Sequence, residues 1–227
     1  MCGRFTLATP ASKLMQLFHL PLFPDLIPRY NIAPTQLIAC VRVLEDVRQA
    51  VQMRWGLVPS WATDLSIGSR MINARSETVA EKPSFRKAFA ERRCLIPADG
   101  FFEWEKTADK RKQPWLIHLE DHQPFAFAGL WERWRPRDAD RSDSTAEVLT
   151  CTILTTSANA DMSPLHDRMP VILSPEDYAT WLSHLATPGQ LNQLMTQLPE
   201  GRLHRYPVSP AMNRPSFDSP ENIQPLN

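Results

Sequence analysis

The residue best suited to act as a nucleophile is Cys2, which directly follows the initiator methionine. A small second residue normally allows removal of Met1, and the mature chain would then begin with a free α-amine and a thiol on adjacent carbons. The amine titrates near about 7.7–8.0 and the thiol near about 8.5, so both are partly nucleophilic around neutral pH. Together they can close a five-membered thiazolidine ring on an aldehyde. An internal cysteine cannot do this, because its nitrogen belongs to a peptide bond. The alternative is that Cys2 has no chemical role.

Two further residues are suited to moving protons. Glu103 lies among aromatic residues in the segment 100–104, GFFEW, and a partly desolvated carboxyl group there would suit general acid–base catalysis. His166 has Asp167 and Arg168 beside it and can shuttle a proton near neutral pH. The alternatives are a strand-edge carboxylate that faces water, and a surface histidine in a polar loop.

Asn73 and Arg75 lie in the segment 73–77, NARSE, which we predict to be extended. In a strand they share one face, because side chains alternate with a period of two. Asn73 could then hold an oxygen by a hydrogen bond, and Arg75 could bind a phosphate through its planar fork of donors. The alternative is a structural cap and a surface ion pair with Glu77.

Three tryptophans, Trp55, Trp61 and Trp104, are candidates for stacking on unpaired bases, although packing in the core is the commoner fate of tryptophan. A nucleic-acid surface also needs a local track of cations, which the helix predicted over 84–93 would equally well present to solvent. The candidates for that track are Arg4, Arg70, Arg75, Arg86, Lys87, Arg92, Arg93 and Arg168.

The composition limits the classes of function. The chain has 227 residues, 43% of them hydrophobic, which fits a single domain over 1–227 with a substantial core. Its formal net charge is zero, so any anion site must be a local patch. We find no membrane span and no signal peptide, and expect a cytoplasmic protein. The four cysteines form no C-x-x-C pair, which argues against a disulfide framework and a metal site, and with seven glycines there is no phosphate loop or cofactor motif.

The elements that must position these residues are mostly strands. We expect an α+β domain, a strand-rich core with peripheral helices and an irregular Pro-rich tail over 210–227. We predict a helix that is capped by Thr9 with Pro10 in its first turn and runs to Phe18, and a second that is capped by Ser174 and runs to about 185. Further helices are predicted over 84–93 and 189–198, a charged hairpin tip over 106–112 and a mobile loop over 136–147. The predicted strands are 36–44, 49–58, 71–77, 94–105 (two strands and a turn), 114–120, 124–134, 147–156, 169–173 and 202–208.

Six sequence blocks, in this order, resemble one family, the SOS response-associated peptidase (SRAP) proteins, which process abasic sites. The resemblance covers residues 2 to about 213. The blocks are Met1–Phe5 (MCGRF), Tyr30–Pro34 (YNIAP), Trp55–Trp61 (WGLVPSW), Ile72–Glu77 (INARSE), Pro97–Trp104 (PADGFFEW) and the run from Thr156 through His166–Pro170 (HDRMP).

The resemblance implies a barrel-like mixed sheet with a basic channel that leads to the N-terminus, no cofactor and no metal. It implies covalent crosslinking to abasic sites in single-stranded DNA, with Cys2 as the nucleophile and Asn73, Glu103 and His166 as the other catalytic residues. It also implies lyase activity as a side outcome and a peptidase event at Met1. We expect a monomer, because the sequence shows no sustained interface pattern, and association with the nucleoid when DNA is bound. Whether junctions with duplex DNA are preferred stays open from the sequence. The residues expected to contact DNA are Arg4, Pro34, Trp55, Trp61, Arg75, Arg86, Trp104 and Arg168.

Two other functions stay open at this point. An N-terminal-nucleophile hydrolase or peptidase would use Cys2 against an amide, with its own amine or His166 as the base, and would leave no stable DNA adduct. A non-enzymatic single-strand binder would use tryptophans and arginines and would be indifferent to Cys2 and to abasic sites.

Overall fold

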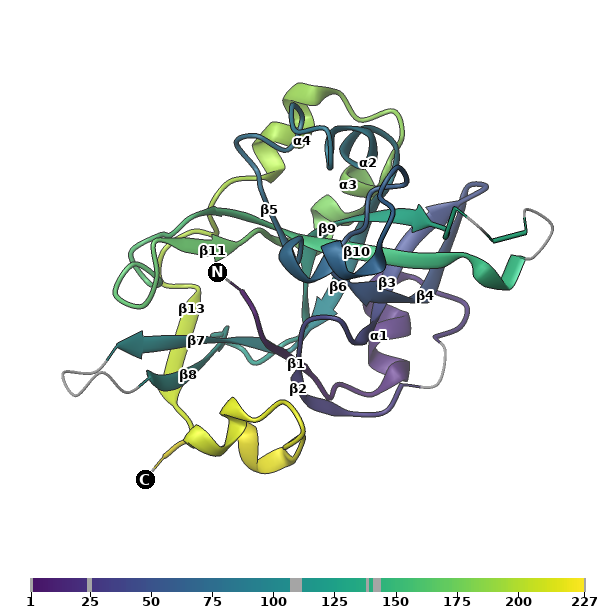
Figure 1. Ribbon diagram of the computed structural model, residues 1–227. Coiled ribbons are helices and arrows are strands. Elements are labelled where there is room, and N and C mark those ends of the chain that lie inside the picture. Colours follow the sequence, from purple (N-terminus) through teal and green to yellow (C-terminus); the bar gives the residue numbers. More distant parts are fainter. Residues whose placement is uncertain (1, 24–25, 107–111, 138, 141–143, 227) are drawn as a thin grey trace.

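Two β-sheets form the body of the protein (Figure 1). The computed structural model describes residues 2–23, 26–106, 112–137, 139–140 and 144–226. One sheet has five strands in the order β13-β8-β7-β1-β2, and the other has eight, with the path β11-β10-β4-β3-β6-β9-β12 and β5 beside β10. The first sheet contains β1 (Phe5–Leu7), β2 (Arg29–Ile32), β7 (Gly100–Lys106), β8 (Lys112–Leu119) and β13 (Leu203–Pro207). The second contains β3 (Leu37–Leu44), β4 (Val47–Trp55), β5 (Asn73–Arg75), β6 (Arg93–Ala98), β9 (Phe125–Trp134), β10 (Val148–Ser157), β11 (Arg168–Pro170) and β12 (Ile172–Leu173).

The larger sheet closes on itself around β10. This strand pairs with β4 on one side and with β9 on the other, so the path β10-β4-β3-β6-β9 returns to β10. It runs parallel to β4 and β5 and antiparallel to β9 and β11. The predicted α+β class, with a strand-rich, barrel-like mixed sheet, is therefore confirmed.

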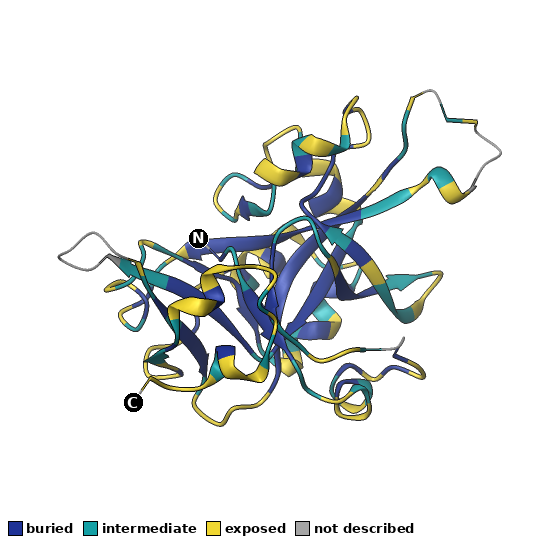
Figure 2. Cartoon of the chain, turned by 60° about the horizontal axis from the view of Figure 1, so that its bottom comes forward, coloured by how far each residue is buried: buried dark blue, intermediate teal, exposed yellow. Residues whose placement is uncertain are grey.

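Helices lie at the periphery, as predicted. They are α1 (Ala11–Phe18), α2 (Arg86–Glu91), α3 (Tyr178–Leu182) and α4 (Pro188–Leu194), with 3₁₀ turns at Leu65–Arg70, Ser144–Ala146, Pro175–Asp177, Pro210–Asn213 and Pro220–Ile223. In Figure 2 the strands at the centre are mostly buried, whereas the helices and turns around them carry the exposed residues. Within the described residues, no helix is both long and apolar enough to cross a membrane.

Aromatic rings fix the first strand inside the core. The Phe5 ring lies edge-to-face against Trp55, with ring centroids 5.3 Å apart, and against Phe127 at 5.8 Å. All three side chains are buried. Such geometry contributes beyond the burial of apolar area. The position of β1, and with it the start of the chain, is therefore set by packing at the centre of the protein.

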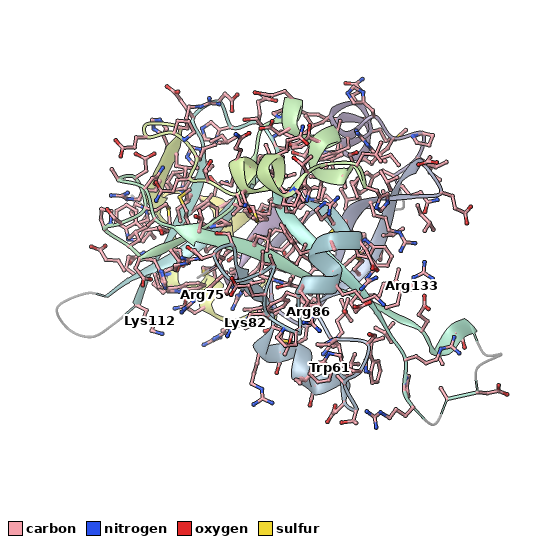
Figure 3. All side chains as sticks on the ribbon, turned by 90° about the horizontal axis from the view of Figure 1, so that it is seen from above. Trp61, Arg75, Lys82, Arg86, Lys112 and Arg133 are labelled. Atoms are coloured by element: carbon pink, nitrogen blue, oxygen red, sulfur yellow. The ribbon has the colours of Figure 1, made fainter. Side chains whose placement is uncertain are left out.

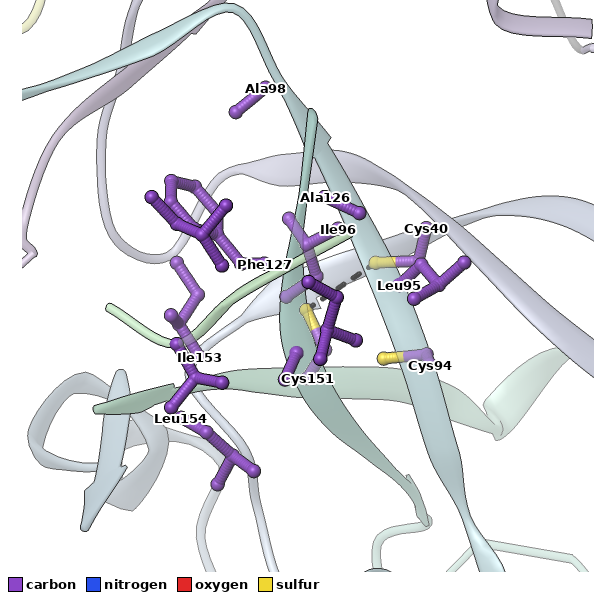
Figure 4. Packing of buried hydrophobic residues seen from close by; sticks show 14 of the residues in the cluster. Cys40, Cys94, Leu95, Ile96, Ala98, Ala126, Phe127, Cys151, Ile153 and Leu154 are labelled. Atoms are coloured by element: carbon purple, nitrogen blue, oxygen red, sulfur yellow. Dashed lines mark hydrogen bonds between the residues drawn. The ribbon is translucent and has the colours of Figure 1, made fainter. Parts of the chain in front are cut away.

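Three cysteines from separate strands meet in the same core (Figure 4). Cys40, Cys94 and Cys151 are free thiols without solvent exposure, and the sulfurs of Cys40 and Cys151 lie 3.7 Å apart. Burial raises the pKa of each thiol above its ordinary value. These cysteines therefore pack as small, protonated apolar groups.

Neither of the two predicted capping residues, Thr9 and Ser174, makes a capping bond, although Ser174 does stand at the N-cap position before Pro175. The Thr9 hydroxyl donates a hydrogen bond of 2.6 Å to the Asp99 carboxylate, and α1 starts at Ala11 without a side-chain cap. An ionised carboxylate is a strong hydrogen-bond acceptor, and Asp99 also accepts from two backbone amides of the same segment, so Thr9 is held there and does not cap the helix. Ser174 makes no capping bond either. A 3₁₀ turn and the five-residue α3 replace the predicted helix to about 185.

The strand predictions are mostly confirmed, with differences at their ends. The β3–β4 hairpin turns at Glu45 and Asp46, both with positive φ, as a two-residue turn of this kind requires. The single strand predicted over 169–173 is two strands. Val171 bonds to Leu154 and to Ala128, and pairing passes there from β10 to β9.

Strand β4 ends at Trp55 and not at 58, because Gly56 has a φ of 126° and approaches Gly68 closely. The predicted hairpin tip and mobile loop include 107–111, 138 and 141–143, which lie outside the described residues.

Candidate active site

The start of the chain lies along the strand that carries Glu103. Strand β1 pairs with β7 through Phe5 and Phe101, and the amide of Phe102 donates to the carbonyl of Arg4 at 2.9 Å. Cys2 is fully buried just before this ladder. Burial, and then the negative charge of Glu103, raise the pKa of the Cys2 thiol far above its ordinary value. The thiol is therefore protonated at neutral pH.

Asn73 binds the backbone of the candidate nucleophile. Strand β5 pairs with β10, with Asn73 opposite Ile153, and the Asn73 amide nitrogen donates to the carbonyl of Cys2 at 2.8 Å. The amide oxygen of Asn73 is buried and has no hydrogen-bond partner among the described residues. This oxygen is therefore an acceptor available for an amine or a sugar hydroxyl, since a buried acceptor is costly to leave unpaired.

Glu103 and His166 line the same cleft, which has a volume of about 590 Å³. Glu103 is 4% exposed and lies on β7 opposite Trp115 of β8. His166 reaches the cleft from the loop before β11. The other lining residues are Trp104, Glu105, Lys112, Pro164, Leu165 and Asp167. The cleft therefore brings together the two predicted proton-transfer groups, and the charge of Glu103 links it to Cys2.

The loop that carries His166 is anchored at both ends. The amide of His166 donates to the carbonyl of Met162 at 3.1 Å, and the amide of Ala158 donates to the carbonyl of Asp167 at 3.0 Å. The imidazole Nδ1 lies 2.9 Å from the amide nitrogen of Arg168 and 2.7 Å from a carboxylate oxygen of Asp167. The ring of this cleft-lining histidine is thus held at Nδ1.

Two arginines expected to contact DNA have protein partners. Arg168 donates to both carboxylate oxygens of Glu77, at 2.5 and 2.9 Å, and lowers the pKa of that carboxyl group. The Glu77 pair expected as an alternative for Arg75 therefore forms with Arg168. Arg4 donates to the amide oxygen of Asn31 at 2.6 Å and to the carbonyl of Met212 at 3.1 Å. Both arginines thus help to hold the fold around the site.

The three tryptophans occupy different environments. Trp55 is fully buried and donates to the carbonyl of Ile72, so it presents no ring face to a base. Trp104 lines the cleft, and its indole nitrogen donates to the side chain of Asn213 at 2.7 Å. Trp61 is 54% exposed, and Pro34 is half-buried in the turn after β2. Only Trp61 and Trp104 have the exposure that stacking needs.

Exposed cations lie along one side of the protein. Arg75, Lys82, Arg86, Lys112 and Arg133 are exposed, and Figure 3 shows them with Trp61 along the lower edge of that view. We call these five cations the basic face. Lys112 belongs both to this face and to the cleft.

The C-terminal segment 210–217 closes on the start of the chain, a contact that sequence analysis did not predict. The amide nitrogen of Asn31 lies 2.9, 3.0 and 2.7 Å from the carbonyl oxygens of Met212, Arg214 and Phe217. We call this segment, with its bonds to Asn31, Arg4 and Trp104, the C-terminal clasp. The segment YNIAP contains Asn31, but no local pattern connects it to residues 181–186 positions away.

Comparisons with known proteins place these residues in a family. The family model described as SOS response associated peptidase (SRAP) matches residues 1–215. The chain is 41% identical to the abasic site processing protein YoqW of Bacillus subtilis and 39% identical to YoaM, a protein of the same description and organism. The alignments cover 99% of both chains for YoqW, and 100% of this chain and 99% of the relative for YoaM. A crystal structure of a protein from Bacteroides thetaiotaomicron shares the fold, with a TM-score of 0.83 over the whole of both chains and 24% identity.

Proposed function

The chain belongs to the SRAP family, and on that premise we propose that it captures abasic sites in single-stranded DNA through a covalent bond to Cys2. The proposal rests chiefly on one observation. Asn73 bonds to the Cys2 backbone, the charge of Glu103 acts on the Cys2 thiol, and Glu103 shares its cleft with His166. The relatives named for abasic-site processing support the choice of substrate.

Removal of Met1 is the step that creates the nucleophile. While Met1 is attached, the Cys2 nitrogen is an amide without a nucleophilic lone pair. Hydrolysis of that peptide bond frees the α-amine and is the peptidase event that the family description suggests. The new amine lies next to the Cys2 carbonyl that Asn73 binds, so the unpartnered oxygen of Asn73 can accept a hydrogen bond from it.

We expect the amine to attack first, because burial raises the pKa of the Cys2 thiol and so disfavours its thiolate. Its lone pair forms a C–N bond with C1′ of the ring-opened sugar and gives a carbinolamine. The Glu103 carboxylate takes a proton from the attacking nitrogen and returns it to the departing hydroxyl, so that water is lost and a Schiff base is left. The thiol then adds across the C=N bond. Sulfur bonds to C1′, the proton moves to nitrogen, and one water molecule is released overall.

The Schiff base has a second fate. It acidifies the hydrogens at C2′, and removal of one of them expels the 3′ phosphate by β-elimination. Lyase activity is thus a side outcome of the same intermediate, and closure of the thiazolidine ring competes with strand cleavage. The alternative of amide hydrolysis would use the same thiol, whose raised pKa makes it a poor first nucleophile.

The basic face supplies the contact with DNA. Its cations would bind phosphates, with Trp61 and Trp104 against unpaired bases. We expect a monomer that acts on single-stranded DNA, including junctions with duplex, as part of the response to DNA damage. The same substrate places the protein in the cytoplasm and, when bound, on the nucleoid.

A denaturing gel tests the proposal. Protein shown by mass to begin at Cys2 is mixed with a single-stranded oligonucleotide that contains one abasic site, beside an undamaged oligonucleotide and the Cys2→Ala variant. We expect an adduct that survives boiling in detergent and requires both the lesion and Cys2. An adduct that persists in Cys2→Ala, or none with the wild-type protein, would overturn the assignment.

A further inference from the structure

We propose that Asp167 is a positioning residue for His166, and that its carboxylate selects the imidazole tautomer in which Nε2 can accept a proton from the sugar. This inference rests on the proposed function, because it assigns a step to His166. It concerns the side chain that follows His166 in the chain and shares its cleft.

The two contacts at Nδ1 require opposite states of that atom. The backbone amide of Arg168, 2.9 Å away, can only donate, so it needs a lone pair on Nδ1. The Asp167 carboxylate lies 2.7 Å from Nδ1 as an ion-pair contact, and when ionised it can only accept, so a hydrogen bond between them needs a hydrogen on Nδ1. A neutral imidazole satisfies one contact at a time. The loop therefore offers His166 a separate partner for each tautomer.

Each tautomer gives Nε2 a different role. When Nδ1 accepts from Arg168, Nε2 carries the hydrogen and can only donate. When Nδ1–H donates to Asp167, Nε2 has a lone pair and can act as a base. Asp167 also stabilises the imidazolium that forms once Nε2 has taken a proton, because an ionised carboxylate hydrogen-bonds most strongly to a cation.

Opening of the abasic sugar needs both roles in sequence. The proton on the C1′ hydroxyl leaves to Nε2, the C1′–O4′ bond breaks, and the aldehyde forms. O4′ then takes the same proton back from Nε2. The step consumes no other reagent. It begins with Nε2 as a base, and this is the form that Asp167 favours.

Asp167 can serve as a switch because it is free to turn. Its side chain is 87% exposed, while that of His166 is 31% exposed, and the Arg168 amide is fixed at the start of β11. The other charged groups of the cleft are Glu103, Glu105 and Lys112. An exposed ion pair contributes little to stability. Substitution of Asp167 should therefore leave the protein folded, which makes a direct test feasible.

The first test separates rate from binding. Protein that begins at Cys2 reacts in single turnovers with abasic single-stranded oligonucleotide over a range of DNA concentrations. For Asp167→Ala we expect a maximal rate about tenfold lower, less than the roughly 100-fold or more that a general acid–base group contributes, because Asp167 acts only through His166. The half-saturating DNA concentration should stay the same or fall, because a negative charge has been removed. Asp167→Asn, whose amide oxygen still accepts a hydrogen bond, should recover part of the rate.

Glu105→Gln is the matched control. Glu105 lines the same cleft and accepts a hydrogen bond from the Trp115 indole at 3.0 Å. Its substitution removes one negative charge from the cleft without altering the contacts at Nδ1. We expect the maximal rate to stay within twofold of wild type. An equal loss of rate in Glu105→Gln and Asp167→Ala would attribute the effect to charge and refute the positioning role.

The second test reads the tautomer itself. Nitrogen NMR of protein labelled at its histidines distinguishes protonated from unprotonated ring nitrogens, and His166→Gln assigns the signals. We expect Asp167→Ala to move the Nδ1 signal of His166 toward the unprotonated position. An unchanged signal, or a wild-type maximal rate in Asp167→Ala, would overturn the inference. Failure of the wild-type protein to form any adduct would refute the proposed function, and the nitrogen signals would then decide the tautomer alone.

Discussion

Replacement of Asn31 by alanine tests the C-terminal clasp. The Asn31 side chain is fully buried, accepts a hydrogen bond from Arg4, and donates two hydrogens among three carbonyl oxygens. Two neutral hydrogen bonds are worth about 1 kcal/mol each, and one to a charged group about 2 kcal/mol. We therefore expect Asn31→Ala to lower the free energy of unfolding by about 4 kcal/mol.

The control is Asn222→Ala. Asn222 is also fully buried, but its side chain donates to a single carbonyl, that of Phe217, and its oxygen has no partner among the described residues. Its loss should cost about 1 kcal/mol. Urea unfolding followed by tryptophan fluorescence measures both values. Trypsin adds a local measurement, because release of the clasp should expose the bond after Arg214 in Asn31→Ala well before the core unfolds.

The outcome that refutes this reasoning is an equal loss in the two variants. It would mean that Asn31 contributes only as a buried amide and that its shared bonds add nothing. A large loss of stability without faster cleavage after Arg214 would also count against the clasp. The stabilisation would then come from the core around β2 and not from the contact between the two ends of the chain.

Three further predictions follow from the geometry. Gly56→Ala should lose about 3 kcal/mol of stability in urea, because Gly56 has a φ of 126° and a new Cβ would lie 2.5 Å from the Gly68 carbonyl oxygen. The control is Gly201→Ala, which should lose about 1 kcal/mol, because Gly201 has a φ of 78° but a new Cβ there would meet nothing within 4 Å. Burial raises the pKa of Cys94 well above 9.0, so above pH 9 the thiol ionises in the unfolded chain before it does so in the folded protein. The stabilisation that buried Cys94 contributes is therefore complete below pH 9 and is lost above it, and the stability difference between wild type and Cys94→Ala should shrink by about 1.4 kcal/mol per pH unit above 9. A constant difference in urea titrations would contradict this. Arg75→Ala should weaken capture at low DNA concentration and reduce the slope of log binding against log salt by about 0.7, with the maximal rate unchanged, and an unchanged slope would remove Arg75 from the DNA contact.

The sequence predicted the chemical groups of the site better than their partners. Cys2, Asn73, Glu103 and His166 were expected from side-chain chemistry and family resemblance, and the structure gives each a place around one cleft or one backbone contact. A residue type states what a side chain can do. It does not state which distant group will become its hydrogen-bond or ion-pair partner in the folded protein.

Arg168 shows this limit. An arginine beside a histidine was a reasonable phosphate ligand, yet its fork binds Glu77, a residue 91 positions away. Nothing near Arg168 in the sequence indicates that partner, because it is the pairing of both β11 and β5 with β10 that brings the two segments together.

Trp55 is a different case, since a signal was present. Met53 and Trp55 are both buried, two residues apart on β4, which is the alternation of an inward strand face. Such an alternation can be recognised from the sequence alone, and it predicts that Trp55 lies in the core. Trp55 was expected to contact DNA because it belongs to the family block WGLVPSW, and the alternation along its strand was not considered.

The pairing of strand β10 constrains how the sequence of this protein can evolve. It pairs with the strand of Asn73 opposite Ile153 and with the strand after His166 opposite Ser157. These two points lie four residues apart, about 13 Å along the strand. Backbone hydrogen bonds set that spacing, and they do not depend on which side chains the strand carries. Substitutions along β10 can therefore accumulate while the segments of Asn73 and His166 keep their distance, whereas a single residue inserted or deleted between these two points would shift their register.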